Sequence, residues 1–179
     1  RANRVAIFPF NIKNEDFNLS AQLKVFSQQD KVFLELQSYV DQIDVAKIHQ
    51  NLPESLADTK SAIWLNNALG SGVLKDVLFT TRFTLSGDDA LPMTKLTANL
   101  ENVKLTMNSK WAPITGLNAR VTFTNDHVKI TGKDAKLDTL DLSYINIDAS
   151  NLGSPDAQLV IHGRVKSSSE EIVDFMRRS

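Results

Sequence analysis

Three histidines are the residues best suited to acid–base or metal chemistry in this chain. His49, His127 and His162 lie far apart in the sequence, and no HExxH pair, GxSxG elbow or P-loop accompanies them. His49 falls in a helical stretch, whereas His127 and His162 fall in strand-like stretches with solvent-type neighbours. This pattern is typical of surface or helix-capping histidines, and it predicts no catalytic or ligand role for them.

The aspartates also give no motif for chemistry. Asp88 and Asp89 lie in a turn-forming stretch, and a hard cation needs several convergent oxygen ligands. Three further aspartates, Asp134, Asp138 and Asp141, have the spacing of a solvent-exposed acidic edge. This spacing does not indicate a pair of carboxylates for acid–base catalysis. The absence of cysteine removes thiolate nucleophiles and zinc–cysteine sites. We therefore expect no enzyme, no metal and no cofactor; the enzymatic alternative is a hydrolase or sugar-processing β-domain, without an identifiable carboxylate pair.

The composition excludes several other classes of protein. The 179 residues are 42% hydrophobic and 23% charged, which indicates a globular domain. The formal net charge is -1 and the basic residues are interspersed with acids, so nucleic-acid binding is not expected. No apolar run approaches the roughly 20 residues of a membrane-spanning helix. Because the chain starts at Arg1, we expect a segment of a longer protein, in which an anchor or export signal can lie outside these residues.

Most of the chain alternates between apolar and polar residues, which is the period of a half-buried strand. The apolar stretch from Val5 to Phe10 contains Pro9 and suits an edge strand, because proline lacks a donor for the ladder. The alternation is regular from Phe17 to Val25, and it returns from Val32 to Leu36 after a polar turn. This pair of segments predicts a hairpin.

A second hairpin is predicted around a two-residue loop at Asn125 and Asp126. Its register pairs Thr124 with His127, Phe123 with Val128, and Val121 with Ile130. The apolar set changes parity near Glu101 and Asn102, which predicts a β-bulge there, and a further parity shift lies between Leu142 and Ile145.

Three short amphipathic helices are expected beside the strands. Asp44 can cap the first, over about residues 44–50. The second, over about 56–69, lies in the segment Leu52–Gly72, where Gly70 and Gly72 supply a C-terminal stop. These glycines follow the helix, whereas a phosphate-binding loop precedes one. The third helix, over about 169–177, follows a strand as the first does, which is compatible with the start of another structural unit.

These elements predict a mainly β fold, α+β in class, built as a large curved antiparallel meander that forms a groove. We interpret residues 1–179 as a single β-rich segment with a helical insert at 44–70. Such a sheet has a strongly apolar face and few long helices to cover it. Either the sheet curls on itself, or something else covers that face.

Several short motifs occur in a characteristic order over about Val40 to Ser179. They are Leu52-Pro53, Trp64-Leu65, Ala68-Leu69-Gly70, Trp111 with Pro113, and the strand pair from Leu117 to Gly132. The order of these motifs resembles the YhdP branch of the AsmA-like proteins of Gram-negative bacteria.

The resemblance implies a very large periplasmic protein, anchored in the inner membrane by an N-terminal helix, whose repeated β-units stack into a curved trough. It also implies a conduit that carries phospholipid toward the outer membrane, with acyl chains and neighbouring repeat units as partners of this segment. Each buried methylene contributes roughly 0.8 kcal/mol, so an apolar lining can hold acyl chains without catalysis. The alternative is a structural or assembly module of the same envelope protein, whose apolar face is a closed core.

On the lipid hypothesis, apolar residues from the strands beyond residue 72 line the groove. They are Val77, Phe79, Phe83, Leu85, Leu96, Ala98, Leu100, Leu105, Met107, Val121, Phe123, Val128 and Ile130. The same residues also suit the core of an ordinary closed sandwich. Trp64, Leu65 and Leu69 of the expected second helix would shield one end of the apolar face as an end cover.

Overall fold

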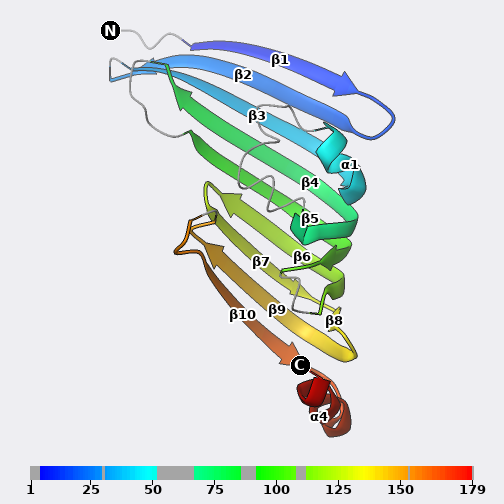
Figure 1. Cartoon of the computed structure of the whole chain (residues 1–179). Coiled ribbons are helices and arrows are strands. Elements are labelled where there is room, and N and C mark those ends of the chain that lie inside the picture. Colours follow the sequence, from blue (N-terminus) through cyan, green and yellow to red (C-terminus); the bar gives the residue numbers. More distant parts are fainter. Residues whose placement is uncertain are drawn as a thin grey trace.

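The computed structural model describes residues 5–29, 31–51, 67–85, 92–107, 112–152 and 154–178 (Figure 1). Its helices are α1 (Val45–Asn51) and α4 (Ser169–Arg178). The strands are β1 (Val5–Lys13), β2 (Asn18–Gln28), β3 (Lys31–Asp44), β4 (Leu69–Thr84), β5 (Met93–Leu105), β6 (Ile114–Thr124), β7 (His127–Lys133), β8 (Ala135–Leu137), β9 (Leu140–Ser150) and β10 (Gln158–Val165).

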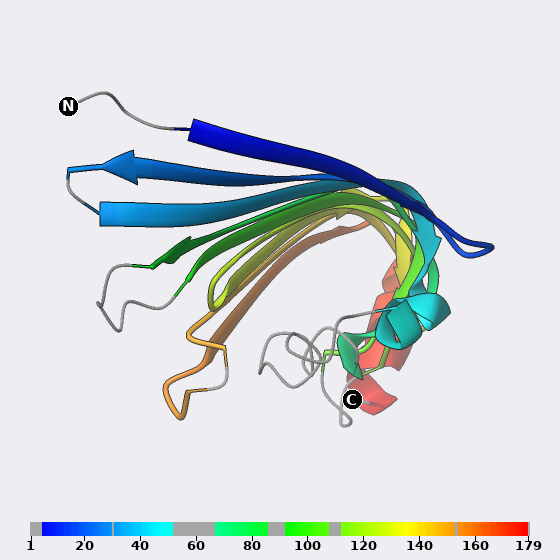
Figure 2. The same cartoon turned by 90° about the horizontal axis from the view of Figure 1, so that it is seen from above.

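All ten strands form one antiparallel sheet. The order along the sheet is β1-β2-β3-β4-β5-β6-β7-β9-β10, and the short β8 pairs with β6 and β9. Figure 2 shows that the strands curl strongly toward the end where α1 lies. The structure therefore confirms the mainly β, curved antiparallel meander. The proline-containing β1 lies at one edge of the sheet, as predicted.

The predicted hairpin at Asn125 and Asp126 has the expected register. Thr124 pairs with His127, Phe123 with Val128, and Val121 with Ile130. Asn125 adopts a left-handed φ of 52°, which asparagine tolerates better than most residues. Its side-chain Oδ1 accepts a hydrogen bond of 2.8 Å from the backbone N–H of Thr94, so the loop is also tied to β5.

The predicted bulge near Glu101 and Asn102 is also present. The pairing of β5 with β6 steps from Leu100–Ala119 to Val103–Leu117, and Asn102 has a φ of 50°. The Asn118 side chain holds this irregularity, because its Oδ1 accepts a 3.1 Å hydrogen bond from the Asn102 N–H. The extra residue returns the apolar side chains to the same face of the sheet.

Similar irregularities occur in the neighbouring strands. Left-handed φ angles are found at Asp76 in β4, at Gly116 in β6 and at Asp134 between β7 and β8. In β9, Ser143 is the extra residue between the pairs Tyr144–Arg164 and Leu142–Val165, where the sequence predicts a parity shift. Because bulges bend and twist strands, this series accounts for the shared curl in Figure 2.

The two described helices begin at side-chain caps. Asp44 Oδ1 accepts a 2.8 Å hydrogen bond from the Ala46 N–H at the start of α1, as expected. At the start of α4, Ser168 Oγ accepts from the Glu171 N–H at 3.3 Å, and Glu171 Oε2 accepts from the Ser168 N–H at 2.9 Å. This reciprocal pair is a capping box, which agrees with the predicted helix at 169–177.

The predicted helix over 56–69 lies mostly outside the described residues. Of this stretch, Asn67 and Ala68 are helical, but Leu69 and Gly70 already belong to β4. The role assigned to Gly72 as a helix stop is wrong. Gly72 lies inside β4 with a φ of 115°, and a Cβ there would lie 2.7 Å from the Val103 Cα. It is glycine because β5 approaches its backbone closely.

Gly132 in β7 gives a direct test of this tight strand packing. A Cβ at Gly132 would lie 2.5 Å from the Ala119 Cβ and 2.6 Å from the Asn118 carbonyl oxygen. Because the backbone must shift to relieve this clash, Gly132→Ala is expected to lower the free energy of unfolding by about 1–3 kcal/mol.

The matched control is Gly163→Ala in β10, where the nearest atom would be the Tyr144 carbonyl oxygen at 3.6 Å. Urea denaturation followed by circular dichroism should separate the two variants. Equal midpoints would contradict the close approach of β6 and β7.

Candidate functional site

The cross-strand register aligns apolar residues into a row that crosses the whole sheet. The row takes one residue from each strand on the path from β1 to β10: Phe10, Ala21, Ser38, Phe79, Leu96, Phe123, Val128, Ala149 and Leu159. Ser38 is its only polar member. We call this set the apolar row, and we call the face that carries it the apolar face.

A second line of apolar residues runs beside the apolar row over β5 to β10. It consists of Ala98, Val121, Ile130, Ile147 and Ile161. The apolar face is thus continuous perpendicular to the strands, which is the direction along which a trough formed by curled strands would run.

Exposure along the apolar row differs sharply between its middle and its ends. Val128 is 0% exposed, whereas Phe10 is 42% exposed and Leu159 is 40% exposed. Side chains converge on the inside of a curved sheet, so near-complete burial identifies the apolar face as the inner one. Helix α1 packs on this face through Val45 and Ile48.

The predicted lining residues fall into three groups by exposure. Ala98, Leu100, Leu105, Val121, Val128 and Ile130 are buried. Val77, Phe79, Leu96, Met107 and Phe123 are half-buried. Phe83 and Leu85 are exposed. All but Phe79, Phe83 and Leu85 belong to, or pack against, one hydrophobic cluster. The sheet thus brings most of these residues together, in the manner of a core.

Sequence reasoning omits part of the apolar face. Ile145, Ile147 and Ala149 of β9 belong to the same cluster, and Phe10 and Ala21 extend the row to β1 and β2. Their apolar alternation was a visible signal. What the sequence does not provide is the order of the strands, which decides that these residues share one surface.

The predicted end cover falls partly outside the described residues. Trp64 and Leu65 lie outside the described residues, and Leu69 is a buried residue of β4 in the hydrophobic cluster. Among the described helices, α1 covers the cluster, through Val45 and Ile48. The Lys47 ammonium group lies 3.3 Å from Asp16 Oδ1, which links α1 to the turn between β1 and β2.

The histidines do not converge in the described part of the chain. His127 Nε2 lies 2.8 Å from Asp148 Oδ1 on the surface, and His162 is exposed on β10. His49 lies in α1, and nothing is described of its side chain.

The candidate acids are likewise dispersed. Asp134 and Asp138 have left-handed φ angles on either side of β8, and Asp141 forms a surface ion pair with Lys136 at 3.2 Å. Asp88 and Asp89 lie outside the described residues. Within the described ranges, no group of three or more histidines and acids is placed to hold a metal ion.

Comparison with known families decides the identity of the chain. The family model described as YhdP protein matches residues 3–179. The chain belongs to the YhdP family. No curated protein and no solved structure matches it. Among the described helices of this YhdP family member, none is long and apolar enough to cross a membrane.

Two leucines from the predicted lining allow a test of which part of the apolar face is core. Leu100 is 2% exposed and Leu85 is 56% exposed. Leu100→Ala is expected to lower the free energy of unfolding by about 2–5 kcal/mol, because it leaves a cavity in a packed cluster. Leu85→Ala should change it by less than about 0.5 kcal/mol.

Urea denaturation midpoints of the two variants give the comparison. A loss at Leu85→Ala as large as the loss at Leu100→Ala would contradict the division between a buried and an exposed part of the face.

Proposed function

We propose that this chain is a non-enzymatic, lipid-handling segment of a bridge-like phospholipid transport protein. The parent protein is anchored in the inner membrane, the segment lies in the periplasm, and neighbouring units of the same protein continue its sheet. Phospholipid acyl chains contact the apolar face. Membership of the YhdP family supports this class of function.

The observation that carries the proposal is the apolar row. It joins all nine strands of the main path, and it remains exposed at both edges, with Phe10 at one end and Leu159 at the other. A sheet that only closes its own core has no need for exposed apolar residues at both ends of a continuous row. An acyl chain that lies along the row gains a uniform apolar environment with no single strong site.

The accessible part of the apolar face lies over β1 to β4. Phe8, Phe10, Ile12 and Phe83 are exposed there, whereas the apolar residues of β5 to β9 on this face are buried or half-buried. We therefore assign acyl-chain contact mainly to this part. The buried part stabilises the curl.

The second candidate function is a structural or assembly module of the envelope. It is favoured by the six predicted lining residues that are buried in the hydrophobic cluster. If this reading holds, neighbouring units cover the exposed part of the face and no lipid reaches it.

Photocrosslinking from the two faces of β4 distinguishes the lipid-handling function from the structural one. A benzophenone amino acid at Phe83 probes the apolar face, and one at Leu78 probes the opposite face; the native residues are 37% and 51% exposed. After irradiation in cells, mass spectrometry is expected to find phospholipid adducts at position 83 and few at position 78.

A probe at Phe123, which is half-buried in the apolar row, serves as a second site. If the probes at Phe83 and Phe123 capture only protein, the lipid proposal fails for this segment. Equal lipid capture from Leu78 would indicate non-specific contact with membranes.

A further inference from the structure

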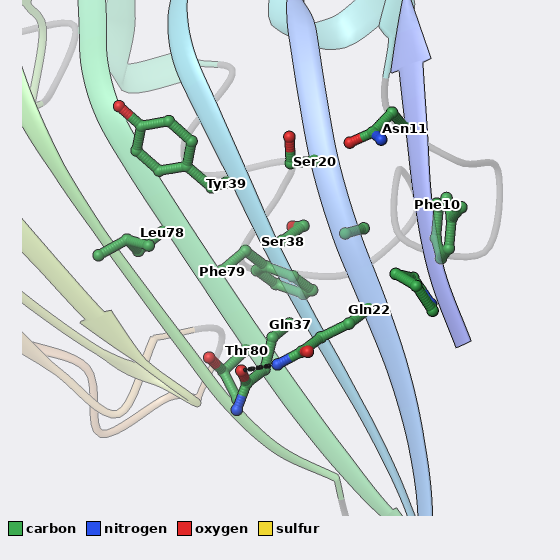
Figure 3. A pocket seen from close by; sticks show the side chains of 12 residues that line it. Phe10, Asn11, Ser20, Gln22, Gln37, Ser38, Tyr39, Leu78, Phe79 and Thr80 are labelled. Carbon is green, nitrogen blue, oxygen red and sulfur yellow. Dashed lines mark hydrogen bonds between the residues drawn. The ribbon is translucent and has the colours of Figure 1, made fainter. Parts of the chain in front are cut away.

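The face opposite the apolar face, which we call the polar face, carries a hollow of about 360 Å³ over β1 to β4 (Figure 3). This volume falls within the roughly 300–1,000 Å³ that is typical of small-molecule sites. The hollow lies near the β1 edge of the sheet and not over the hydrophobic cluster.

Two parallel rows of side chains form the walls of the hollow. Asn11, Ser20, Tyr39 and Leu78 are paired across the strands in one row. Pro9, Gln22, Gln37 and Thr80 are paired in the other row. Side chains alternate between faces, so the apolar row between them contributes mainly backbone to the floor.

The lining of the hollow contains no charged side chain. Its polar groups are amides and hydroxyls, and these can both donate and accept hydrogen bonds. Tyr39 and Leu78 add an aromatic ring and an aliphatic chain beside them (Figure 3). This combination fits a neutral ligand that has many hydroxyl or amide groups and also apolar C–H surfaces. It offers no charged group to bind an ion.

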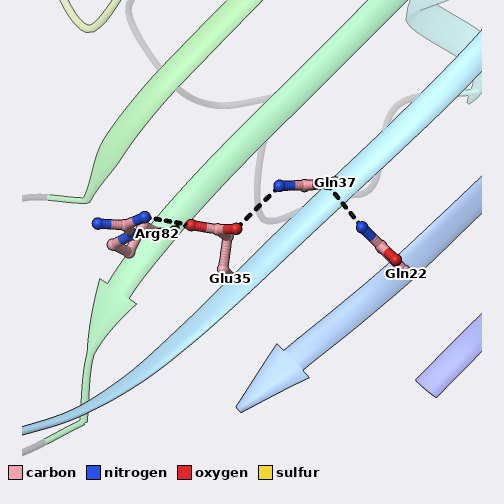
Figure 4. A network of polar contacts seen from close by, with 4 residues as sticks. All are labelled: Gln22, Glu35, Gln37 and Arg82. Carbon is pink, nitrogen blue, oxygen red and sulfur yellow. Dashed lines mark hydrogen bonds and ion pairs between the residues drawn. The ribbon is translucent and has the colours of Figure 1, made fainter. Parts of the chain in front are cut away.

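A chain of hydrogen bonds fixes the amides in place (Figure 4). Arg82 Nε donates to Glu35 Oε2 at 2.8 Å, and Gln37 Nε2 donates to Glu35 Oε1 at 2.9 Å. Gln22 Nε2 then donates to Gln37 Oε1 at 2.7 Å. Glu35 is only 5% exposed, so its buried carboxylate orients both glutamines before any ligand arrives.

Tyr39 is held from the other side of the hollow. Its hydroxyl donates to Asp76 Oδ1 at 3.1 Å, and Asn99 Nδ2 donates to Asp76 Oδ2 at 2.9 Å. The hydrogen bond to Asp76 raises the pKa of Tyr39, and partial burial and the charges of Asp76 and Asp41 act in the same direction. The hydrogen bond to Asp76 also restrains the Tyr39 side chain, whose cross-strand partner is Leu78.

We propose that this hollow binds a neutral oligosaccharide. The amides of Gln22 and Gln37 and the hydroxyl of Ser20 bond to sugar hydroxyl or acetamido groups, while the Tyr39 ring packs against the C–H face of a sugar ring. The site lies on the face opposite the one assigned to acyl chains. The oligosaccharide proposal can therefore fail while the lipid proposal holds, and the reverse is also true.

The proposal is tested by titrating the purified 179-residue chain with N,N′,N″-triacetylchitotriose, cellotriose and maltotriose, followed by saturation-transfer NMR. At least one trisaccharide is expected to bind saturably. Gln22→Met should weaken binding roughly 2- to 10-fold, since it removes one hydrogen-bonding group from the wall. Tyr39→Ala should abolish it.

Gln42→Met is the matched control, because Gln42 is exposed on β3 but does not line the hollow. It should bind as the native chain does. Ser20→Ala, which should also weaken binding, provides a second probe if Gln22→Met perturbs the fold by circular dichroism. Failure of all three sugars to bind, equal binding by Gln22→Met and Gln42→Met, or binding of trialanine in place of the sugars would overturn the proposal.

Discussion

The whole structure depends on one constraint: each strand must present its apolar side chains to the same face as its neighbours. A shift of one residue moves every following side chain to the opposite face. In β5 and β9 the sequence changes parity, and the structure absorbs each change in a bulge at Asn102 or Ser143. The apolar row therefore continues without a break, and the same bulges help the sheet to curl. Continuity of the apolar face and its curvature have a common physical origin.

The curl also explains why the apolar face has both a buried region and a solvent-exposed region. Where the strands bend most and α1 packs on them, side chains such as Val103, Leu105 and Leu117 are fully buried. Toward β1 the apolar residues keep contact with solvent on a single layer of sheet. A core and an accessible apolar surface are thus two regions of one face.

The opposite face combines polar contacts with local aromatic packing. Glu35 is nearly as buried as the core residues, and on the same face Phe26 and Phe33 stack with their ring centroids 5.3 Å apart. Its carboxylate is stabilised by Arg82 and Gln37, which removes the cost of an unpaired buried charge. The hydrogen bonds among Arg82, Glu35, Gln37 and Gln22 thus lie on the outer face, whereas the hydrophobic cluster lies on the inner face.

The sequence by itself determined the local structure: the hairpin at Asn125–Asp126, the bulge at Asn102, the cap of α1, the helix α4, and the β class. These depend on residues close together in the chain, where alternation and turn chemistry act directly. Sequence reasoning misjudged Gly72, and it assigned no role to Glu35, because both roles depend on contacts with other strands. Only the tertiary structure decided which lining residues are buried, because exposure depends on strand order and on how far the sheet curls.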